Sequence, residues 1–177
     1  MAVRISPDCR TILGGSIFGI EELRFAQDSS RAQVSDPPLE RQQPSLVRIL
    51  VVDDNPAVRH YLRAILEQQN SWQVCGEART GTEAIDRVPE CSPDVILLDF
   101  QMPDLNGLDI ARAIRHSSPT IPILMVTVHM STQLAAEARA VGIRGACAKS
   151  DVGSIVEAVQ TLLDEKSYFP SMASMRE

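Results

Sequence analysis

The chain has 177 residues, of which 44% are apolar and 23% charged, enough for one domain of ordinary size with its own core and a short extra segment. A formal charge of −6 and an isoelectric point near 5.1 argue against a basic surface for nucleic acid or an anionic membrane. No apolar run approaches the roughly 20 residues that span a bilayer, and residues 1–19 lack the features of a secretion signal. We therefore expect a cytoplasmic protein without a membrane partner and without direct contact to nucleic acid.

The first 45 residues differ in composition and hydrophobic pattern from the rest of the chain. They are rich in proline and polar residues, with no hydrophobic period longer than two turns, and predict a linker or disordered arm over residues 1–45. Residues 16–26 could form a short transient helix. The four cysteines, Cys9, Cys75, Cys91 and Cys147, lie far apart and form no Cys-x-x-Cys pair. We predict reduced, mostly buried thiols rather than a zinc site or a disulfide framework.

From Leu46 onward, short apolar runs alternate with amphipathic stretches. Continuous apolar runs are typical of strands that are buried on both faces, as in a parallel sheet covered by helices. The predicted strands are Val47–Val52, Trp72–Cys75, Val95–Leu98, Ile121–Val126 and Gly145–Ala148.

Helical periodicity and start signals fill the intervals between these runs. Periodic apolar residues predict helices over Pro56–Gln69, Leu108–Arg115 and Ile155–Leu163. The predicted N-caps are Asn55, Thr80, Ser131 and Asp151. Five strands alternating with five helices predict a doubly wound α/β domain with a five-stranded parallel sheet over residues 46–165. Residues 166–177 would form a C-terminal tail or the start of a linker.

Charged and polar side chains follow the strands at the edge where ligands bind in such sheets, outside the carboxyl ends of the strands. The residues in question are Asp53 and Asp54, Asp99, Thr127 and Lys149. Three neighbouring carboxylates repel one another unless a cation compensates, and oxygen ligands of this kind suit Mg²⁺. One of the carboxylates could also act as a nucleophile and form an acyl phosphate, with Thr127 and Lys149 binding the phosphoryl oxygens.

These motifs resemble the receiver domain of two-component response regulators. The matching runs are Ile49–Asn55, Asp94–Pro103 with Gly107, Thr127 and Lys149, and the stretch Gly142–Pro170 is most similar to receivers that precede LuxR-type helix-turn-helix domains. The resemblance implies a flavodoxin-like (βα)5 fold with strand order 2-1-3-4-5.

The same resemblance assigns a role to each site residue. It implies that Asp99 is the phosphoacceptor and that Asp53 and Asp54 form the acidic pair that holds Mg²⁺ together with Asp99. The backbone carbonyl of Gln101 would complete the metal ligands. Thr127 would move onto the phosphoryl group and Lys149 would pair with it. His129, two residues after Thr127, and Gln101 occupy positions that tune the lifetime of the phosphate in the family.

Two residues depart from the family pattern. Ala146 stands where the family carries a Tyr or Phe three residues before the lysine, and Val128 stands where Ala or Gly is preferred. We therefore predict phosphorylation with a modified or weakened readout, and Val128 could narrow access to the acyl phosphate.

The interpretation is a signalling domain rather than an enzyme. It would take a phosphoryl group from a histidine kinase or phosphotransfer protein onto Asp99 in a Mg²⁺-dependent step and change its affinity for an unidentified output partner. Apolar residues on the last helix are compatible with a homodimer. The alternatives are a non-switching interaction module of the same fold and a DNA-binding regulator without its output domain. A phosphohydrolase is disfavoured because Gln101 replaces the expected acidic residue two positions after Asp99.

Overall fold

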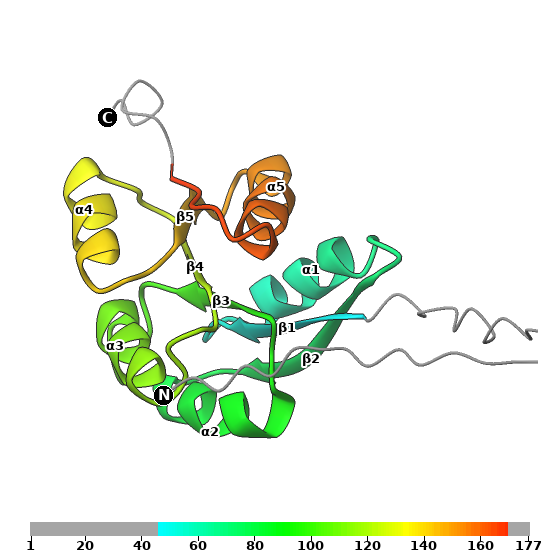
Figure 1. The fold of residues 1–177 in the computed structure, drawn as a ribbon, viewed down its shortest axis with the longest axis horizontal. Helices are drawn as coiled ribbons and strands as arrows, with labels where there is room; N and C mark the ends of the chain where they lie inside the picture. The colour runs from blue at the N-terminus through cyan, green and yellow to red at the C-terminus, as the bar shows by residue number, and fades with distance from the viewer. Residues whose placement is uncertain (1–45, 170–177) are drawn as a thin grey trace, which may run out of the picture. The chain divides into compact units, whose positions relative to one another are not determined.

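The computed structural model describes residues 46–169, which form a parallel five-stranded sheet with a helix after each strand (Figure 1). The strands are β1 (Val47–Val52), β2 (Trp72–Ala78), β3 (Val95–Asp99), β4 (Ile123–Thr127) and β5 (Gly145–Ala148). The helices are α1 (Pro56–Leu66), α2 (Gly81–Cys91), α3 (Gly107–Ser117), α4 (Thr132–Ala140) and α5 (Val152–Leu163). The order β2-β1-β3-β4-β5 confirms the predicted doubly wound topology. The helix considered for residues 16–26 lies outside the described residues.

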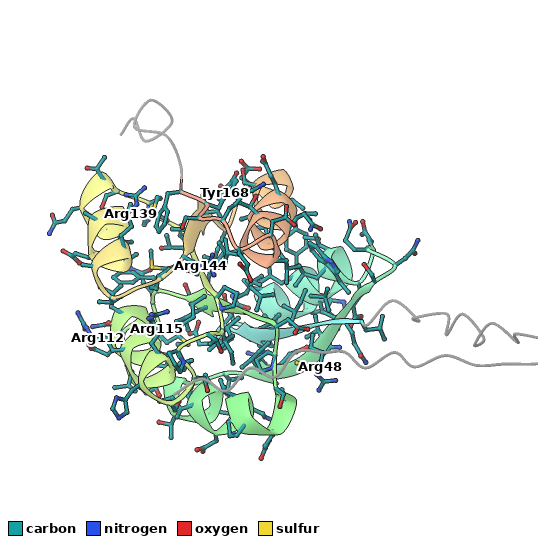
Figure 2. The ribbon with its side chains drawn as sticks, in the orientation of Figure 1. Arg48, Arg112, Arg115, Arg139, Arg144 and Tyr168 are labelled. Carbon is teal, nitrogen blue, oxygen red and sulfur yellow. The ribbon has the colours of Figure 1, made fainter. Side chains whose placement is uncertain are left out.

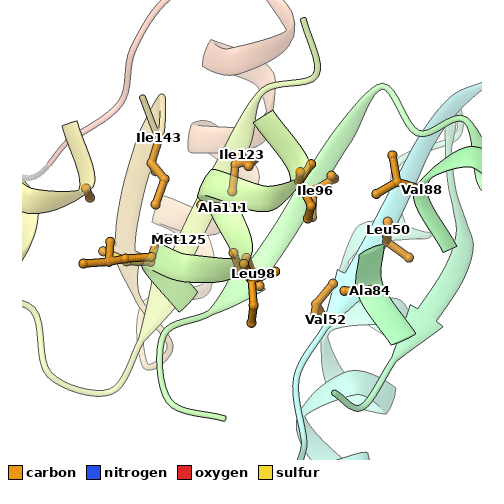
Figure 3. Packing of buried hydrophobic residues seen from close by; sticks show 14 of the residues in the cluster. Leu50, Val52, Ala84, Val88, Ile96, Leu98, Ala111, Ile123, Met125 and Ile143 are labelled. Atoms are coloured by element: carbon orange, nitrogen blue, oxygen red, sulfur yellow. The ribbon is translucent and has the colours of Figure 1, made fainter. Parts of the chain in front are cut away.

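Alternate side chains of each strand enter two separate apolar clusters, because successive residues of a strand point to opposite faces of the sheet. On one face, Leu50 and Val52 of β1 pack with Ile96 and Leu98 of β3 against α2, α3 and α4 (Figure 3). On the other face, Ile49 and the residues in phase with it pack against α1 and α5 (Figure 1). Burial on both faces explains why the strands read as unbroken apolar runs.

All four predicted N-caps are confirmed by side-chain hydrogen bonds. Asn55, Thr80, Ser131 and Asp151 each accept a bond from a backbone N–H in the first turn of α1, α2, α4 and α5 respectively. These caps fix where each helix begins relative to the preceding strand. Each cap therefore also fixes one end of the loop that joins its helix to the preceding strand.

Residues 166–169 continue beyond α5 and lie against β5. Tyr168 pairs with Gly145, and its carbonyl accepts a 2.8 Å hydrogen bond from the backbone N–H of Ala146. The phenol of Tyr168 lies 3.3 Å from the Glu157 carboxylate. The Cζ atom of the Arg139 guanidinium lies 3.9 Å from the centroid of the Phe169 ring. Figure 2 shows Arg139 and Tyr168 on either side of β5.

Three cysteines lie among the described residues, and all three are free thiols. Cys91 and Cys147 are buried and Cys75 is partly buried, which agrees with the prediction, whereas Cys9 lies outside the described residues. Burial raises the pKa of the Cys147 thiol to about 12. None of the helices in residues 46–169 is both long and apolar enough to cross a membrane.

Candidate functional site

The loop after β1 supplies two carboxylates with different surroundings. Asp53 is buried and Asp54 is exposed. The Oδ1 atom of Asp53 accepts a 3.0 Å hydrogen bond from the backbone N–H of Asn55, whose own side chain caps α1. The turn that starts α1 therefore orients the Asp53 side chain toward the sheet edge and leaves Asp54 facing solvent.

Asp99 and Lys149 meet Asp53 at the same edge, although they come from β3 and from the end of β5. The Lys149 Nζ atom lies 2.6 Å from Asp53 Oδ2 and 2.9 Å from Asp99 Oδ2. The side chains of Asp53, Asp99 and Lys149 are only 1%, 4% and 16% exposed. Lys149 is held in register by its backbone N–H, which donates to the Thr127 carbonyl at 2.8 Å. One ammonium therefore bridges two buried carboxylates.

The ionisation of Asp99 and Lys149 follows from this arrangement. Burial raises the pKa of the Asp99 carboxyl above its usual value, and the charge of Asp53 adds to the increase, although Lys149 opposes it. Burial alone would lower the pKa of the Lys149 ammonium, but the hydrogen bonds and charges of Asp53 and Asp99 together raise it. The lysine is thus held in its charged form beside the carboxylates.

The carboxylates fit a hard divalent cation. Within residues 46–169, Asp53, Asp54 and Asp99 each offer an oxygen, and these oxygens lie within 4.8 Å of one another. Three carboxylates against one ammonium leave a formal charge of −2 at the site, which a divalent ion would balance. Oxygen donors from two or three carboxylates are typical ligands for Mg²⁺.

Thr127 ends β4 on the same edge and is buried. Within residues 46–169 its Oγ1 atom makes two hydrogen bonds, both long: it accepts from the His129 N–H at 3.4 Å and donates to the His129 carbonyl at 3.5 Å. Bonds of this length are weak, so the hydroxyl can leave them at small cost.

Residues that follow β3 and β4 line a surface pocket of about 570 Å³ next to α4. Gln101 and Val128 line it with Phe100, His129 and residues of α4. Val128 is 59% exposed. A hydrogen bond from the Gln101 backbone N–H lowers the pKa of the Asp99 carboxyl, but the opposing effect of burial is larger.

Ala146 is fully buried in β5, in the apolar cluster that also contains Leu134 and Ala138 of α4. The aromatic residue that packs on this cluster from the C-terminal side is Phe169. His60 and His116 are exposed on α1 and α3. Within residues 46–169, the group of side chains that could hold a metal ion consists of Asp53, Asp54 and Asp99.

Sequence reasoning missed several residues that hold the loops of this site. Asp104, in the loop after Asp99, accepts hydrogen bonds from the N–H groups of Gly81 and Thr82 at 3.1 and 3.2 Å and so ties that loop to the start of α2. Asn106 caps α3. The sequence did contain a signal for both residues, because Asp and Asn close before a glycine favour turns and helix N-caps. Arg59, which contacts the loop after β1, was also missed.

The strand order and the acidic cluster at the carboxyl edge define the class of flavodoxin-like receiver domains. Comparison with known proteins agrees. The family model of the response regulator receiver domain matches residues 49–160. The chain therefore belongs to the response regulator receiver domain family, which places it in two-component signalling.

The matched relatives carry different names, and the matched region covers a different share of each. The chain is 46% identical over 92 residues to a protein-glutamate methylesterase/protein-glutamine glutaminase of Pyrococcus abyssi, covering 52% of this chain and 24% of that protein. It is 34% identical over 118 residues to the transcriptional regulatory protein LnrK of Bacillus subtilis, covering 66% and 54%. A solved LuxR-family response regulator from Aurantimonas sp. has 31% identity and a TM-score of 0.70, covering 74% of this chain and 95% of that one. The chain thus spans between a quarter and just over half of these curated relatives.

Proposed function

We propose that this domain accepts a phosphoryl group on Asp99 from a histidine kinase or phosphotransfer protein, in a Mg²⁺-dependent step, and thereby changes its affinity for an output partner. The observation that carries the proposal is the bridge from Lys149 to Asp53 and Asp99 beside exposed Asp54. A carboxylate nucleophile, a set of oxygen ligands and a fixed ammonium are the parts that phosphoryl transfer to aspartate requires.

The side chains of this site can account for each bond change in the phosphoryl transfer. An oxygen of Asp99 attacks the phosphorus of a phosphohistidine, the new O–P bond forms as the P–N bond breaks, and the departing imidazole takes a proton. Asp53, Asp54, Asp99 and the Gln101 carbonyl would hold Mg²⁺, which supplies positive charge to the phosphoryl oxygens when bound. Lys149 pairs with the phosphoryl oxygens once Asp99 carries the phosphoryl group.

Intact mass measurement after incubation with acetyl phosphate tests the proposal. The wild-type chain should gain one phosphoryl group in Mg²⁺ and lose this gain in EDTA, and Asp99→Asn should gain none. Asp109→Asn, which removes an exposed aspartate that pairs with Arg112 on α3, is the matched control and should behave as wild type. An adduct that survives in Asp99→Asn would contradict the assignment, and steady turnover of a phosphate ester would favour the hydrolase alternative.

The switching step is expected to act through Thr127. Because the two hydrogen bonds of its hydroxyl to His129 are long, binding to a phosphoryl oxygen should draw the hydroxyl inward and move the start of α4. On phosphorylation, amide chemical shifts of Thr127 and α4 should change in wild type and in Thr127→Ser, but the α4 changes should vanish in Thr127→Val.

Phosphorylation without any change at Thr127 or α4 in the wild type would favour the non-switching module. The full burial of small Ala146 keeps that alternative open, because no side chain at this position can swing between two arrangements.

A second candidate concerns the whole protein. The matches to a transcriptional regulator and to a LuxR-family structure support a receiver that controls a DNA-binding output domain. Sequencing the gene beyond the codon for Glu177 distinguishes this candidate from a receiver that acts on a separate partner, including a second copy of itself.

A further inference from the structure

Two arginines of α1 lie one turn apart and pair with the same carboxylate on β2. The Nε atom of Arg59 lies 3.1 Å from Glu77 Oε2, and the Nε atom of Arg63 lies 2.8 Å from Glu77 Oε1. Burial would raise the pKa of the Glu77 carboxyl, but the hydrogen bonds and charges of Arg63 and Arg59 lower it below its usual value. Glu77 is therefore a charged anchor for both guanidinium groups.

Of these two arginines, Arg59 alone also contacts the loop after β1 that carries Asp53 and Asp54. Its Nη1 atom donates to the backbone carbonyl of Asp53 at 2.7 Å and to that of Asp54 at 3.2 Å. Its side chain is 15% exposed, against 36% for Arg63, whose remaining contact is with Glu67 at the end of the helix. The fork of Arg59 thus joins the β2 carboxylate to the two peptide units that carry the candidate metal ligands.

We propose that Arg59 is a positioning residue for the Asp53–Asp54 pair, and that it increases the affinity of the site for Mg²⁺ without touching the ion. The inference rests on the proposed function in that it takes these carboxylates as metal ligands. A planar guanidinium held at one end by Glu77 fixes the peptide units at its other end, and fixed peptide units restrict where the carboxylates lie. Ligands that are already in place lose less freedom when they bind an ion.

Electrostatics alone predicts the opposite effect. A positive charge behind a cation site repels the cation, so removing Arg59 would tighten binding if charge were its main influence. Lysine separates the two accounts, because it keeps the charge but has no fork that spans both Glu77 and the two carbonyls. Positioning predicts weaker binding in Arg59→Met and in Arg59→Lys, whereas charge predicts tighter binding in the first and no change in the second.

The test is a Mg²⁺ titration of the ¹⁵N-labelled chain at constant ionic strength, followed by the amide shifts of residues 53–55 and 99–101. We expect the dissociation constant to rise about 10-fold in Arg59→Met and to rise clearly in Arg59→Lys. Arg63→Met is the matched control, since it removes the other partner of Glu77 and leaves the loop untouched, and it should stay within about twofold of wild type. Equal weakening in Arg63→Met, or unchanged or tighter binding in both Arg59 variants, would overturn the inference.

The same samples keep this inference separate from the proposed function. The titration reads Mg²⁺ binding directly, and the acetyl phosphate assay reads acceptance of a phosphoryl group. Weakened binding in the Arg59 variants with no adduct in the wild type would uphold the role of Arg59 and reject phosphorylation of Asp99. A wild-type adduct, with no effect of the Arg59 variants on the titration, would reject the role of Arg59 and uphold phosphorylation of Asp99.

Discussion

Lys149→Met is expected to lower the free energy of unfolding by about 3 kcal/mol at pH 8 without Mg²⁺, because it leaves two buried carboxylates without their cation. Asp53 and Asp99 are almost fully buried, and the ammonium contacts both at 2.6 and 2.9 Å. Urea unfolding of the variant and the wild type measures the difference. Lys166→Met is the control, since Lys166 is 73% exposed and lies 4.0 Å from Asp164, and its effect should be below about 0.5 kcal/mol.

The loss in Lys149→Met should depend on pH with a definite sign. The pKa of Asp99 is already raised by burial and by Asp53, and removing the opposing ammonium raises it further. A group whose pKa is higher in the folded than in the unfolded state holds its proton more tightly when folded, so the variant gains stability as the pH falls through the folded-state pKa. The deficit relative to wild type should therefore be smaller at pH 5 than at pH 8.

Two further arms check the cause of this loss. Adding Asp99→Asn to Lys149→Met removes one of the uncompensated charges and should restore part of the stability. Saturating Mg²⁺ should also restore part of it, because the ion replaces the missing positive charge. An equal deficit at both pH values, with no recovery in either arm, would show that lost packing rather than charge causes the effect.

Gly107→Ala is the second substitution for which we expect a large effect. A Cβ atom at this position would lie 2.7 Å from the Asp99 carbonyl oxygen and 2.9 Å from the Phe100 Cα atom, and neither backbone atom can move independently. We expect a loss of about 2 kcal/mol in the free energy of unfolding. Because the clash displaces the peptide unit of Asp99, formation of the phosphoryl adduct should slow as well.

Gly153→Ala is the matched control for this substitution. A Cβ atom there would meet only the Asp151 carboxylate oxygen at 3.7 Å, an ordinary contact within the first turn of α5. Alanine favours helix by up to about 1 kcal/mol over glycine, so this variant should be as stable as wild type or more stable. Equal stability of Gly107→Ala and Gly153→Ala would mean that the loop after β3 yields without cost.

The sequence predicted most residues of each strand. The predicted and observed strand bounds differ where the apolar run and the backbone pairing do not cover the same residues. The prediction is confirmed to the residue for β1 and β5. The apolar run in β2 stops at Cys75, yet the strand continues to Ala78, because Glu77 is held by arginines of α1 while its backbone pairs with β1. The predicted β4 began at Ile121 and was wrong by two residues, since Pro122 has no N–H to donate to a neighbouring strand.

Helix bounds were predicted unevenly. The end of α5 at Leu163 is confirmed, but its predicted start at Ile155 was wrong by three residues, and the prediction Leu108–Arg115 for α3 was too short by one residue at the start and two at the end. The start of α1 at Pro56 is confirmed by the Asn55 cap, but the predicted end at Gln69 was wrong, because the helix stops at Leu66. Beyond Leu66 the N–H groups of Gln68 and Gln69 donate to carbonyls only three residues back, so the chain tightens into turns before β2. Apolar periodicity does not distinguish such a turn from another half-turn of helix.

In the candidate site, the sequence predicted which residues meet but not which contacts their side chains make. Strand ends and composition were sufficient to bring Asp53, Asp99 and Lys149 to one edge, because the topology of a parallel sheet leaves them no other place. They could not show that the Lys149 ammonium bridges two carboxylates or that Arg59, rather than Arg63, reaches the loop. These facts depend on side-chain conformations that tertiary packing selects from several of similar energy.

The pairing of Tyr168 with β5 has a consequence for association between molecules. β5 is the outermost strand on its side of the sheet, and an uncovered outer strand offers free N–H and C=O groups to a strand of another chain. Tyr168 occupies the N–H of Ala146 and the carbonyl of Arg144. A chain cut after Glu165 would expose both groups, and it would be prone to edge-to-edge aggregation even though every strand and helix of the domain is still present.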